Sequence, residues 1–218
     1  LKVYYKESGS IDRKQNVIEP HQLELWGNGG SETVQGKQET NTLLAESFKE
    51  LALQHPIEKI TIKEITDKAG VIRPTFYNHF QDKYELLEWI ILTDLLEPIR
   101  PLIENQMISE ALLLLFMNIE KARKFYMQTV RLEGQNSFES IARGCVKGIL
   151  LEIIEKNAVK KMPKFHWLTP ERVAEYYAQS MCSVVIVWIK SGMTISAKEL
   201  VEIYEYMLEH SIAEVLFG

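Results

Sequence analysis

Residues 73–79 carry the side chains best suited to chemistry in this chain, because their polar groups fall on one side of an expected short helix. At helical spacing Thr75, Asn78 and His79 share one face, and Arg73 and Tyr77 flank it. Such side chains donate to and accept from base edges in the major groove of DNA, which admits an α-helix. The pattern predicts a recognition helix. The alternative is a plain helical hairpin that completes a core.

Two apolar rings and a tight turn are expected to position this helix. Phe76 and Phe80 are four residues apart and can pack inward together. Gly70 ends the preceding helix, since glycine adopts the left-handed backbone that a sharp stop often needs. Pro74 suits the first turn of the next helix. Residues 61–83 therefore predict a helix-turn-helix. A further helix starts after it, where Lys83 and the first backbone amides are well placed for a DNA phosphate.

Other kinds of chemistry have no matching motif. The histidines are scattered, without the spacing of metal ligands, at His21, His55, His79, His166 and His210. No glycine-rich phosphate loop follows a strand, and no Ser or Cys lies in a nucleophile motif. We therefore expect no enzyme, no metal and no cofactor. Cys145 and Cys182 lie in apolar helical patterns and are expected to be buried free thiols of a cytoplasmic protein.

The net charge of −5 hides a local basic excess. Within residues 59–83 basic side chains outnumber acidic ones, at Lys59, Lys63, Lys68, Arg73 and Lys83. The excess is small, so non-specific DNA affinity is expected to be modest. The longest apolar runs, such as 181–189, are about half a membrane span, so no membrane partner is expected. No basic region followed by an apolar stretch indicates a secretory signal.

Hydrophobic periodicity and capping residues predict an all-α fold in three parts. These are a flexible N-terminal arm over residues 1–37, a DNA-binding domain over 38–84 and an effector-sensing, dimerising body over 85–218. Helices are expected at about 40–55, 62–69, 73–80, 83–98, 109–118, 119–131, 137–157, 169–190 and 196–216.

The stretch from about Thr40 to Leu92 resembles the DNA-binding head of the TetR family of bacterial regulators. The resemblance lies in the leading helix LLAESFKELALQHP, the turn A-G-V, the segment R-P-T-F-Y-N-H-F and the following D-K-Y-E-L-L. It implies that Arg73, Thr75, Tyr77 and His79 occupy DNA-contacting positions. It also implies a base or phosphate contact for Lys63 on the preceding helix. Asn78 replaces the bulkier aromatic residue often found there.

The resemblance also implies an effector pocket among the body helices. Large adaptable side chains are the candidates for its lining, and ordinary core packing is the alternative for each of them. They are Phe116, Met117, Phe125, Tyr126, Trp167, Tyr176, Tyr177 and Met181. A pocket of this composition suits an apolar or aromatic effector.

The last two helices carry more apolar surface than one small body needs, and a two-fold four-helix interface is the expected use. Its candidate residues are Val184, Val185, Trp188, Ile203 and Met207. The predicted function is dimeric binding to a pseudo-palindromic operator, as a repressor released by a small-molecule or protein effector. One alternative is an activator that acts with a protein coactivator, because the C-terminal half weakly resembles regulators of dihydroxyacetone kinase operons. Another is a helical small-molecule-binding protein that does not bind DNA.

Overall fold

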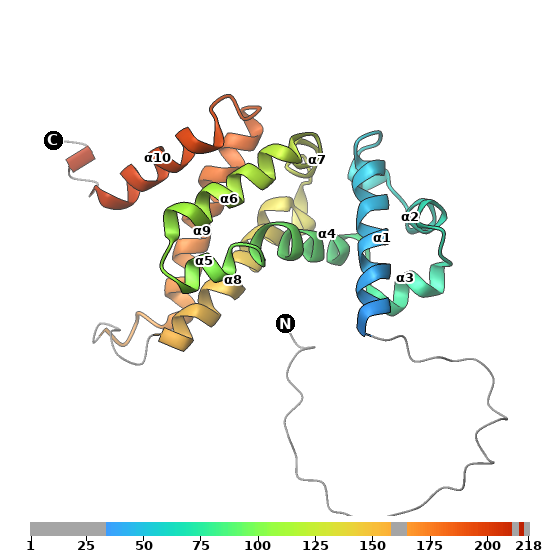
Figure 1. Cartoon of the computed structure of the whole chain (residues 1–218), viewed down its shortest axis with the longest axis horizontal. Helices are drawn as coiled ribbons and strands as arrows, with labels where there is room; N and C mark the ends of the chain where they lie inside the picture. The colour runs from blue at the N-terminus through green and yellow to red at the C-terminus, as the bar shows by residue number, and fades with distance from the viewer. Residues whose placement is uncertain (1–33, 158–164, 211–213, 216–218) are drawn as a thin grey trace, which may run out of the picture.

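The computed structural model describes residues 34–157, 165–210 and 214–215, and this part of the chain is helical with no strand. A small head lies at one end and a larger body at the other, and helix α4 runs between them (Figure 1). The all-α prediction is confirmed. The head comprises α1 (Val34–Ala52), the 3-10 turn η2 (Ile57–Lys59), α2 (Ile62–Ala69) and α3 (Arg73–His79), and α4 spans Lys83–Ile91.

The ends of α1 differ from the prediction. The helix starts at Val34, so residues 34–37 do not belong to a flexible arm; residues 1–33 lie outside the described part of the chain. The Thr40 hydroxyl donates to the Gly36 carbonyl at 3.0 Å within this first stretch. At the other end the helix stops at Ala52 and residues 53–55 form a turn; Pro56 disfavours helical conformation at His55, where the prediction placed the helix end.

Local caps define the two helices of the predicted helix-turn-helix. The Thr61 hydroxyl accepts from the Glu64 amide at 3.2 Å, and the Glu64 carboxylate accepts from the Thr61 amide at 2.8 Å. This is a capping box, which satisfies two amides that a helix start leaves open. Gly70 ends α2 at φ 70°, in the left-handed region. Both features confirm the expected turn.

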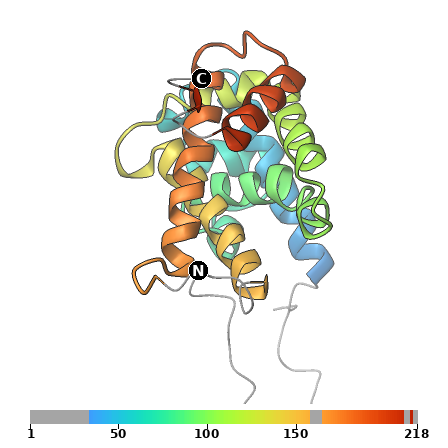
Figure 2. The same cartoon turned by 90° about the vertical axis from the view of Figure 1, so that its left-hand side faces the viewer.

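The body contains α5 to α10, and most of its bounds agree with the prediction. Figure 2 shows α8 and α9 packed side by side, with α10 lying against α6. Thr169 caps α9 as expected, whereas α10 ends at Glu209, and the predicted end at Leu216 lies outside the described residues. Helix α5 was not predicted. The bounds are α5 Arg100–Glu104, α6 Ile108–Lys121, α7 Arg123–Thr129, the 3-10 turn η4 Gly134–Asn136, α8 Phe138–Asn157, α9 Pro170–Lys190 and α10 Ala197–Glu209.

The connecting helix is not one regular α-helix to Pro98, as the sequence predicted. After Ile91 the chain forms a π-helical turn, η3 (Leu92–Leu96), in which the Glu97 amide donates to the Leu92 carbonyl at 2.8 Å. Pro98 supplies the reason, because proline has no N–H and its ring clashes with the carbonyl four residues earlier. The backbone therefore widens before the proline.

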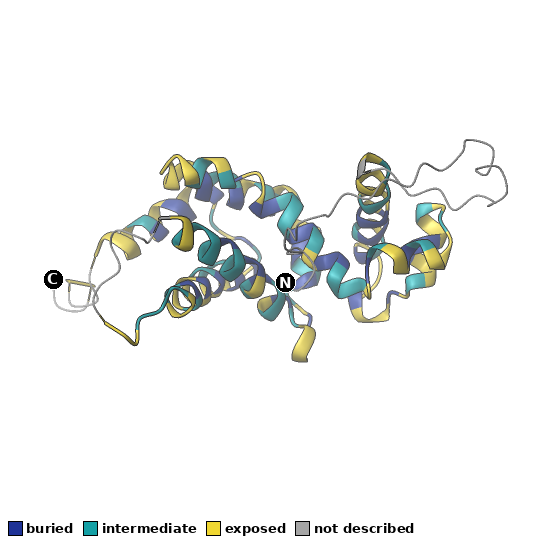
Figure 3. Cartoon of the chain, turned by 90° about the horizontal axis from the view of Figure 1, so that it is seen from below, coloured by how far each residue is buried: buried dark blue, intermediate teal, exposed yellow. Residues whose placement is uncertain are grey.

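One continuous core joins head and body. Figure 3 shows buried residues along the facing sides of the helices and exposed ones along their outer sides. Phe48 of α1 meets Phe125 of α7 edge-on, with ring centroids 6.3 Å apart. In the body, Phe116 contacts the rings of Trp188 and Tyr204 at 5.9 and 6.5 Å. The head therefore packs directly on the body and is not attached through α4 alone.

Candidate nucleic-acid interface and body cavity

Helix α3 is held from behind by aromatic packing. Phe76 is fully buried and Phe80 nearly so, and their ring centroids lie 5.8 Å apart. Phe80 also meets Trp89 of α4 at 6.2 Å. Since the helix has only seven residues, its own hydrogen bonds cannot hold it, and this packing supplies its stability. The arrangement leaves the opposite side of α3 open to solvent.

The outer side of α3 presents the predicted polar groups. Arg73, Tyr77 and Asn78 are exposed, and Thr75 is half-buried. The Arg73 guanidinium donates to the Tyr77 hydroxyl at 3.3 Å and lies 6.0 Å from the centre of its ring. This contact holds the guanidinium over the helix. The remaining N–H groups of Arg73 can therefore bind DNA without a large further loss of side-chain freedom. The two residues form one preorganised contact surface.

His79 is half-buried at the end of α3 and is tied to the first helix. Its Nδ1 lies 2.7 Å from Oδ1 of Asn41 on α1. An amide oxygen only accepts, so Nδ1 donates in this contact. The bond fixes the ring relative to α1. Asn41 was not predicted as a site residue, because a polar residue on an exposed helix face carries no signal that it will meet a residue 38 positions away.

Lys63 and Lys83, the two lysines expected to contact DNA, have different surroundings. Lys63 is exposed on α2 and pairs with Asp67 at 2.5 Å. The ammonium of Lys83 donates to the carbonyls of Ile57, Glu58 and Ile60 at 2.7–2.8 Å.

All three N–H groups of Lys83 are thus occupied by the backbone of the η2 turn. Burial also lowers the pKa of Lys83 below its usual value. A phosphate contact by Lys83 would require this arrangement to change, and the three bonds give Lys83 a structural task within the head.

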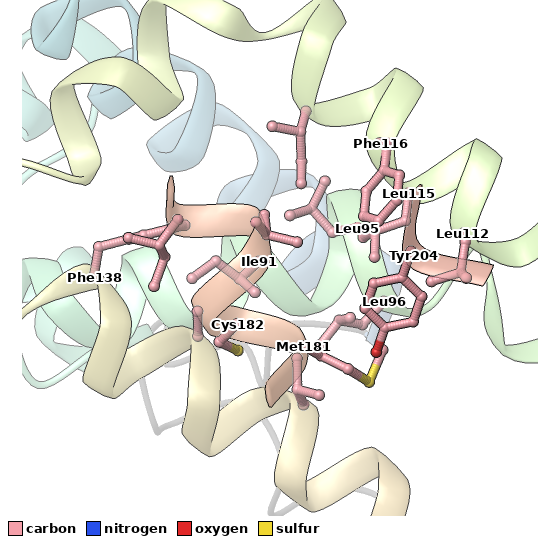
Figure 4. Close-up of a pocket in the computed structure, with 15 residues that line it drawn as sticks. Ile91, Leu95, Leu96, Leu112, Leu115, Phe116, Phe138, Met181, Cys182 and Tyr204 are labelled. Atoms are coloured by element: carbon pink, nitrogen blue, oxygen red, sulfur yellow. The ribbon is translucent and has the colours of Figure 1, made fainter. Parts of the chain in front are cut away.

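The body contains a wholly apolar cavity between the connecting helix and α6, α8, α9 and α10 (Figure 4). Of the predicted lining residues, only Phe116 and Met181 belong to it. Helical spacing does not distinguish core from cavity, so the sequence did not indicate the other lining residues. They are Ile91, Leu95, Leu96, Leu112, Leu115, Ile119, Phe138, Ala142, Val146, Cys182, Val185, Ile186 and Tyr204.

The other predicted pocket residues lie elsewhere. Phe125 and Tyr126 are buried in the core beside the head, and burial raises the pKa of the Tyr126 hydroxyl. Met117 is exposed on α6, and Trp167, Tyr176 and Tyr177 are exposed at the start of α9 and in the segment before it. Large apolar residue types alone do not determine the direction in which each side chain points.

The cavity is small and its thiols are inert. Its volume is about 50 Å³, against about 300–1,000 Å³ for pockets that enclose a drug-sized ligand. An organic occupant therefore needs the walls to move apart. Cys182 lines the cavity and Cys145 lies nearby in α8; both are free and buried, as predicted. Burial raises the pKa of Cys182 to about 11 and that of Cys145 to about 12, so both are protonated at neutral pH.

The apolar surface of α9 and α10 differs in part from the prediction. Ile203 and Met207 are exposed, whereas Val184 and Val185 are half-buried and Val185 faces the cavity. Trp188 is not on this surface, because it is buried and its indole N–H donates to the Ile195 carbonyl at 3.0 Å. Tyr176, Val187 and Tyr206 are exposed on the same two helices and were not predicted for this surface.

Two further features concern only the residues that the structure describes. No helix among them is long and apolar enough to cross a membrane. No three His, Cys, Asp or Glu side chains in those ranges come together in a way that holds a metal ion.

Comparisons with known proteins agree with this architecture. Residues 48–90 match the family model "Bacterial regulatory proteins, tetR family", and residues 106–210 match "Transcriptional regulator C-terminal region". The chain is 27% identical over 147 residues to the HTH-type dhaKLM operon transcriptional activator DhaS of Lactococcus lactis subsp. lactis (strain IL1403), covering 66% of this chain and 76% of that protein.

Solved structures give the same result. A dihydroxyacetone kinase operon activator DhaS is 25% identical, with a TM-score of 0.53 over 78% of this chain and 94% of that one. NalD, the secondary repressor of the MexAB-OprM efflux pump in Pseudomonas aeruginosa, is 16% identical, with a TM-score of 0.51 over 79% and 96%. NalD shows the shared fold alone. Together with the helix-turn-helix geometry, these matches show that the chain is a transcription regulator of the tetR family.

Proposed function

We propose that this regulator binds a pseudo-palindromic operator as a homodimer, through the outer face of α3. The observation that carries the proposal is the geometry of that helix: buried rings hold it from behind, and it presents Arg73, Tyr77 and Asn78 to solvent. Thr75, His79 and Lys63 complete the proposed contact surface. We place the protein in the cytoplasm, where a bacterial regulator meets DNA, and we assign it a regulatory and not an enzymatic role.

Repression released by an effector is the first form of the proposal. Occupancy of an operator is enough to block transcription, whereas activation needs a further contact with another protein. The cavity supports an apolar effector, because apart from the Cys182 thiol and the Tyr204 hydroxyl its lining side chains are hydrocarbon or thioether, and none carries a charge that would satisfy a buried ion. Expansion of the cavity on binding supplies the energetic difference that release requires.

Activation is the second candidate, and the similarity to DhaS favours it. In that case the effector is a coactivator protein, and the exposed aromatic residues Trp167 and Tyr176 offer a surface for it. In-vitro transcription from the duplex upstream of the protein's own coding sequence separates the two forms. The repressor lowers transcript yield and the activator raises it. Absence of sequence-dependent binding to any duplex contradicts both forms and leaves a ligand-binding protein without DNA binding.

The dimer is expected to use the exposed apolar residues of α9 and α10. Met207→Glu and Val187→Glu each place a charge in that interface, so each variant should sediment as a monomer and bind operator weakly through one half-site. Glu133→Lys, on an exposed position outside α9 and α10, is the control and should remain dimeric. If both interface variants sediment as dimers with unchanged circular dichroism, the interface lies on another surface.

A further inference from the structure

Asp94 lies at the point where the connecting helix becomes irregular. Its carbonyl is the one that the ring of Pro98 would meet in a regular helix, since the two residues are four apart. That carbonyl instead accepts from the side-chain amide of Asn118 on α6 at 3.2 Å. The π-helical turn and the contact with α6 therefore share one cause. Such turns are rare in α-helices and frequently lie at functional sites.

The side chain of Asp94 reaches the head. Its carboxylate accepts from the ammonium of Lys49 on α1 at 3.0 Å, and the Lys49 side chain is only 19% exposed. Lys49 also contacts Glu46 at 2.5 Å. Asp94 thus joins α1 through its carboxylate and α6 through its carbonyl. Because Lys49 is largely shielded, this ion pair is weakened less by solvent and salt than an exposed pair.

The residues that follow Asp94 face the other way. Leu95 and Leu96 are buried and line the apolar cavity, together with Ile91 one turn earlier. The other long walls of the cavity belong to regular helices. The wall over residues 92–96 already has an irregular hydrogen-bond pattern, so it can change its geometry without breaking a regular helix. An occupant that expands the cavity therefore displaces this wall most easily.

The head has room to respond. A cleft of about 850 Å³ separates α1 from α6 and α7 beside the Lys49–Asp94 pair, and Lys49, Asp94 and Asn118 all line it. Phe125 also lines this cleft, and α1 touches the body there through the ring of Phe48. A loss of the ion pair therefore leaves an aromatic contact about which the head can turn.

We propose that Asp94 is a positioning residue for operator binding: from the π-helical turn it fixes the head on the body, and displacement of Leu95 and Leu96 by a cavity occupant loosens that hold. The proposal rests on the proposed function, because the placement of a head matters only when two heads bind one operator. Leu95 and Leu96 adjoin Asp94 in the chain, so an occupant of the cavity can influence the contact with the head over a short distance. A ligand shifts the head only through a difference in affinity between the two placements.

The first test uses DNA selected from a pool of random duplexes by the full-length protein. Wild type should select two half-sites at one spacing. Asp94→Asn should select the same half-site bases with a relaxed spacing, and should bind the wild-type duplex about tenfold more weakly. Asp94→Glu, which keeps the charge, should restore the preferred spacing. A preserved spacing and affinity in Asp94→Asn overturns the proposal.

The matched control is Glu152→Gln. It removes one charge from the Arg100–Glu152 ion pair, which lies within the body at 2.8 Å. A purely structural effect of losing a carboxylate would appear in this variant as well. If the effect is specific to Asp94, Glu152→Gln should select the wild-type spacing. If it relaxes the spacing as Asp94→Asn does, the effect is not specific to the head contact and the proposal fails.

The second test needs no DNA and uses hydrogen exchange of the full-length protein. Asp94→Asn should speed amide exchange in segments 43–52 and 92–97, relative to wild type and Glu152→Gln. Ala142→Leu or Val146→Leu fills the cavity from α8 and stands in for an occupant. Either should speed exchange in the same two segments.

Unchanged exchange in both segments, in variants whose circular dichroism matches that of wild type, overturns the proposal. If wild type selects no DNA sequence, the proposed function fails by itself, and the exchange experiment still decides whether Asp94 holds the head.

Discussion

Lys83→Met is expected to destabilise the head and to leave the salt dependence of DNA binding unchanged. The variant removes the ammonium that bonds the carbonyls of Ile57, Glu58 and Ile60, while keeping most of the apolar stem. Charged hydrogen bonds of this kind contribute appreciably, so the free energy of unfolding should fall by about 2 kcal/mol. Urea unfolding of the full chain measures the loss.

The control for this variant is Lys63→Met, which breaks only the exposed pair with Asp67. Its stability should stay within about 1 kcal/mol of wild type, as is usual for exposed ion pairs. If Lys83 contacts a phosphate instead, Lys83→Met will keep wild-type stability, and the slope of log affinity against log salt will fall by about one. A structural role therefore lowers the free energy of unfolding and leaves the salt slope unchanged, whereas a phosphate contact lowers the salt slope and leaves the free energy of unfolding unchanged.

Arg73→Ala is expected to have the largest effect on sequence-specific binding. A bidentate contact between arginine and guanine contributes about 1–3 kcal/mol of discrimination, or about five- to 150-fold in dissociation constant. Fluorescence anisotropy with the selected duplex and with a shuffled duplex measures this difference.

The loss should appear on the selected duplex and be much smaller on the shuffled one. Tyr77→Phe is a useful companion, because it removes only the hydroxyl that accepts from the Arg73 guanidinium. It should give a smaller loss of affinity, again mainly on the selected duplex. Equal losses on both duplexes would make Arg73 a phosphate contact, and no loss on either would remove it from the interface.

The elements that could be predicted from the sequence are those defined by local chemistry. Thr61 with Glu64, Gly70 and Thr169 define helix ends by bonds or backbone angles within a few residues, and the structure has each of them where the pattern placed it. The pair Phe76 and Phe80 likewise follows from helical spacing alone. Local rules were sufficient to place α3 and to say which side of it faces outward.

The features that were missed depend on partners far away in the chain. Lys83 bonds residues 23–26 positions earlier, and His79 meets Asn41 across 38 positions. Pro98 predicts a helix end, whereas the structure has a π-helical turn before it, and the Asp94 carbonyl accepts from Asn118, 24 positions away. Helical spacing predicts Trp188 on the apolar surface of α9, whereas its side chain is buried and its indole N–H donates to the Ile195 carbonyl.

Hydroxyl-radical footprinting of the dimer on its selected duplex is the most direct test of the central claim, that two copies of α3 bind one two-fold symmetric operator. Two heads bound on one side of the duplex must lie about 34–36 Å apart, or a multiple of that distance. The account predicts two protected patches with this separation at the lowest protein concentration that saturates the duplex with wild type, and loss of protection in both patches when Arg73→Ala is used at that same concentration. One patch alone, uniform protection without sequence preference, or two patches that persist in Arg73→Ala would contradict it.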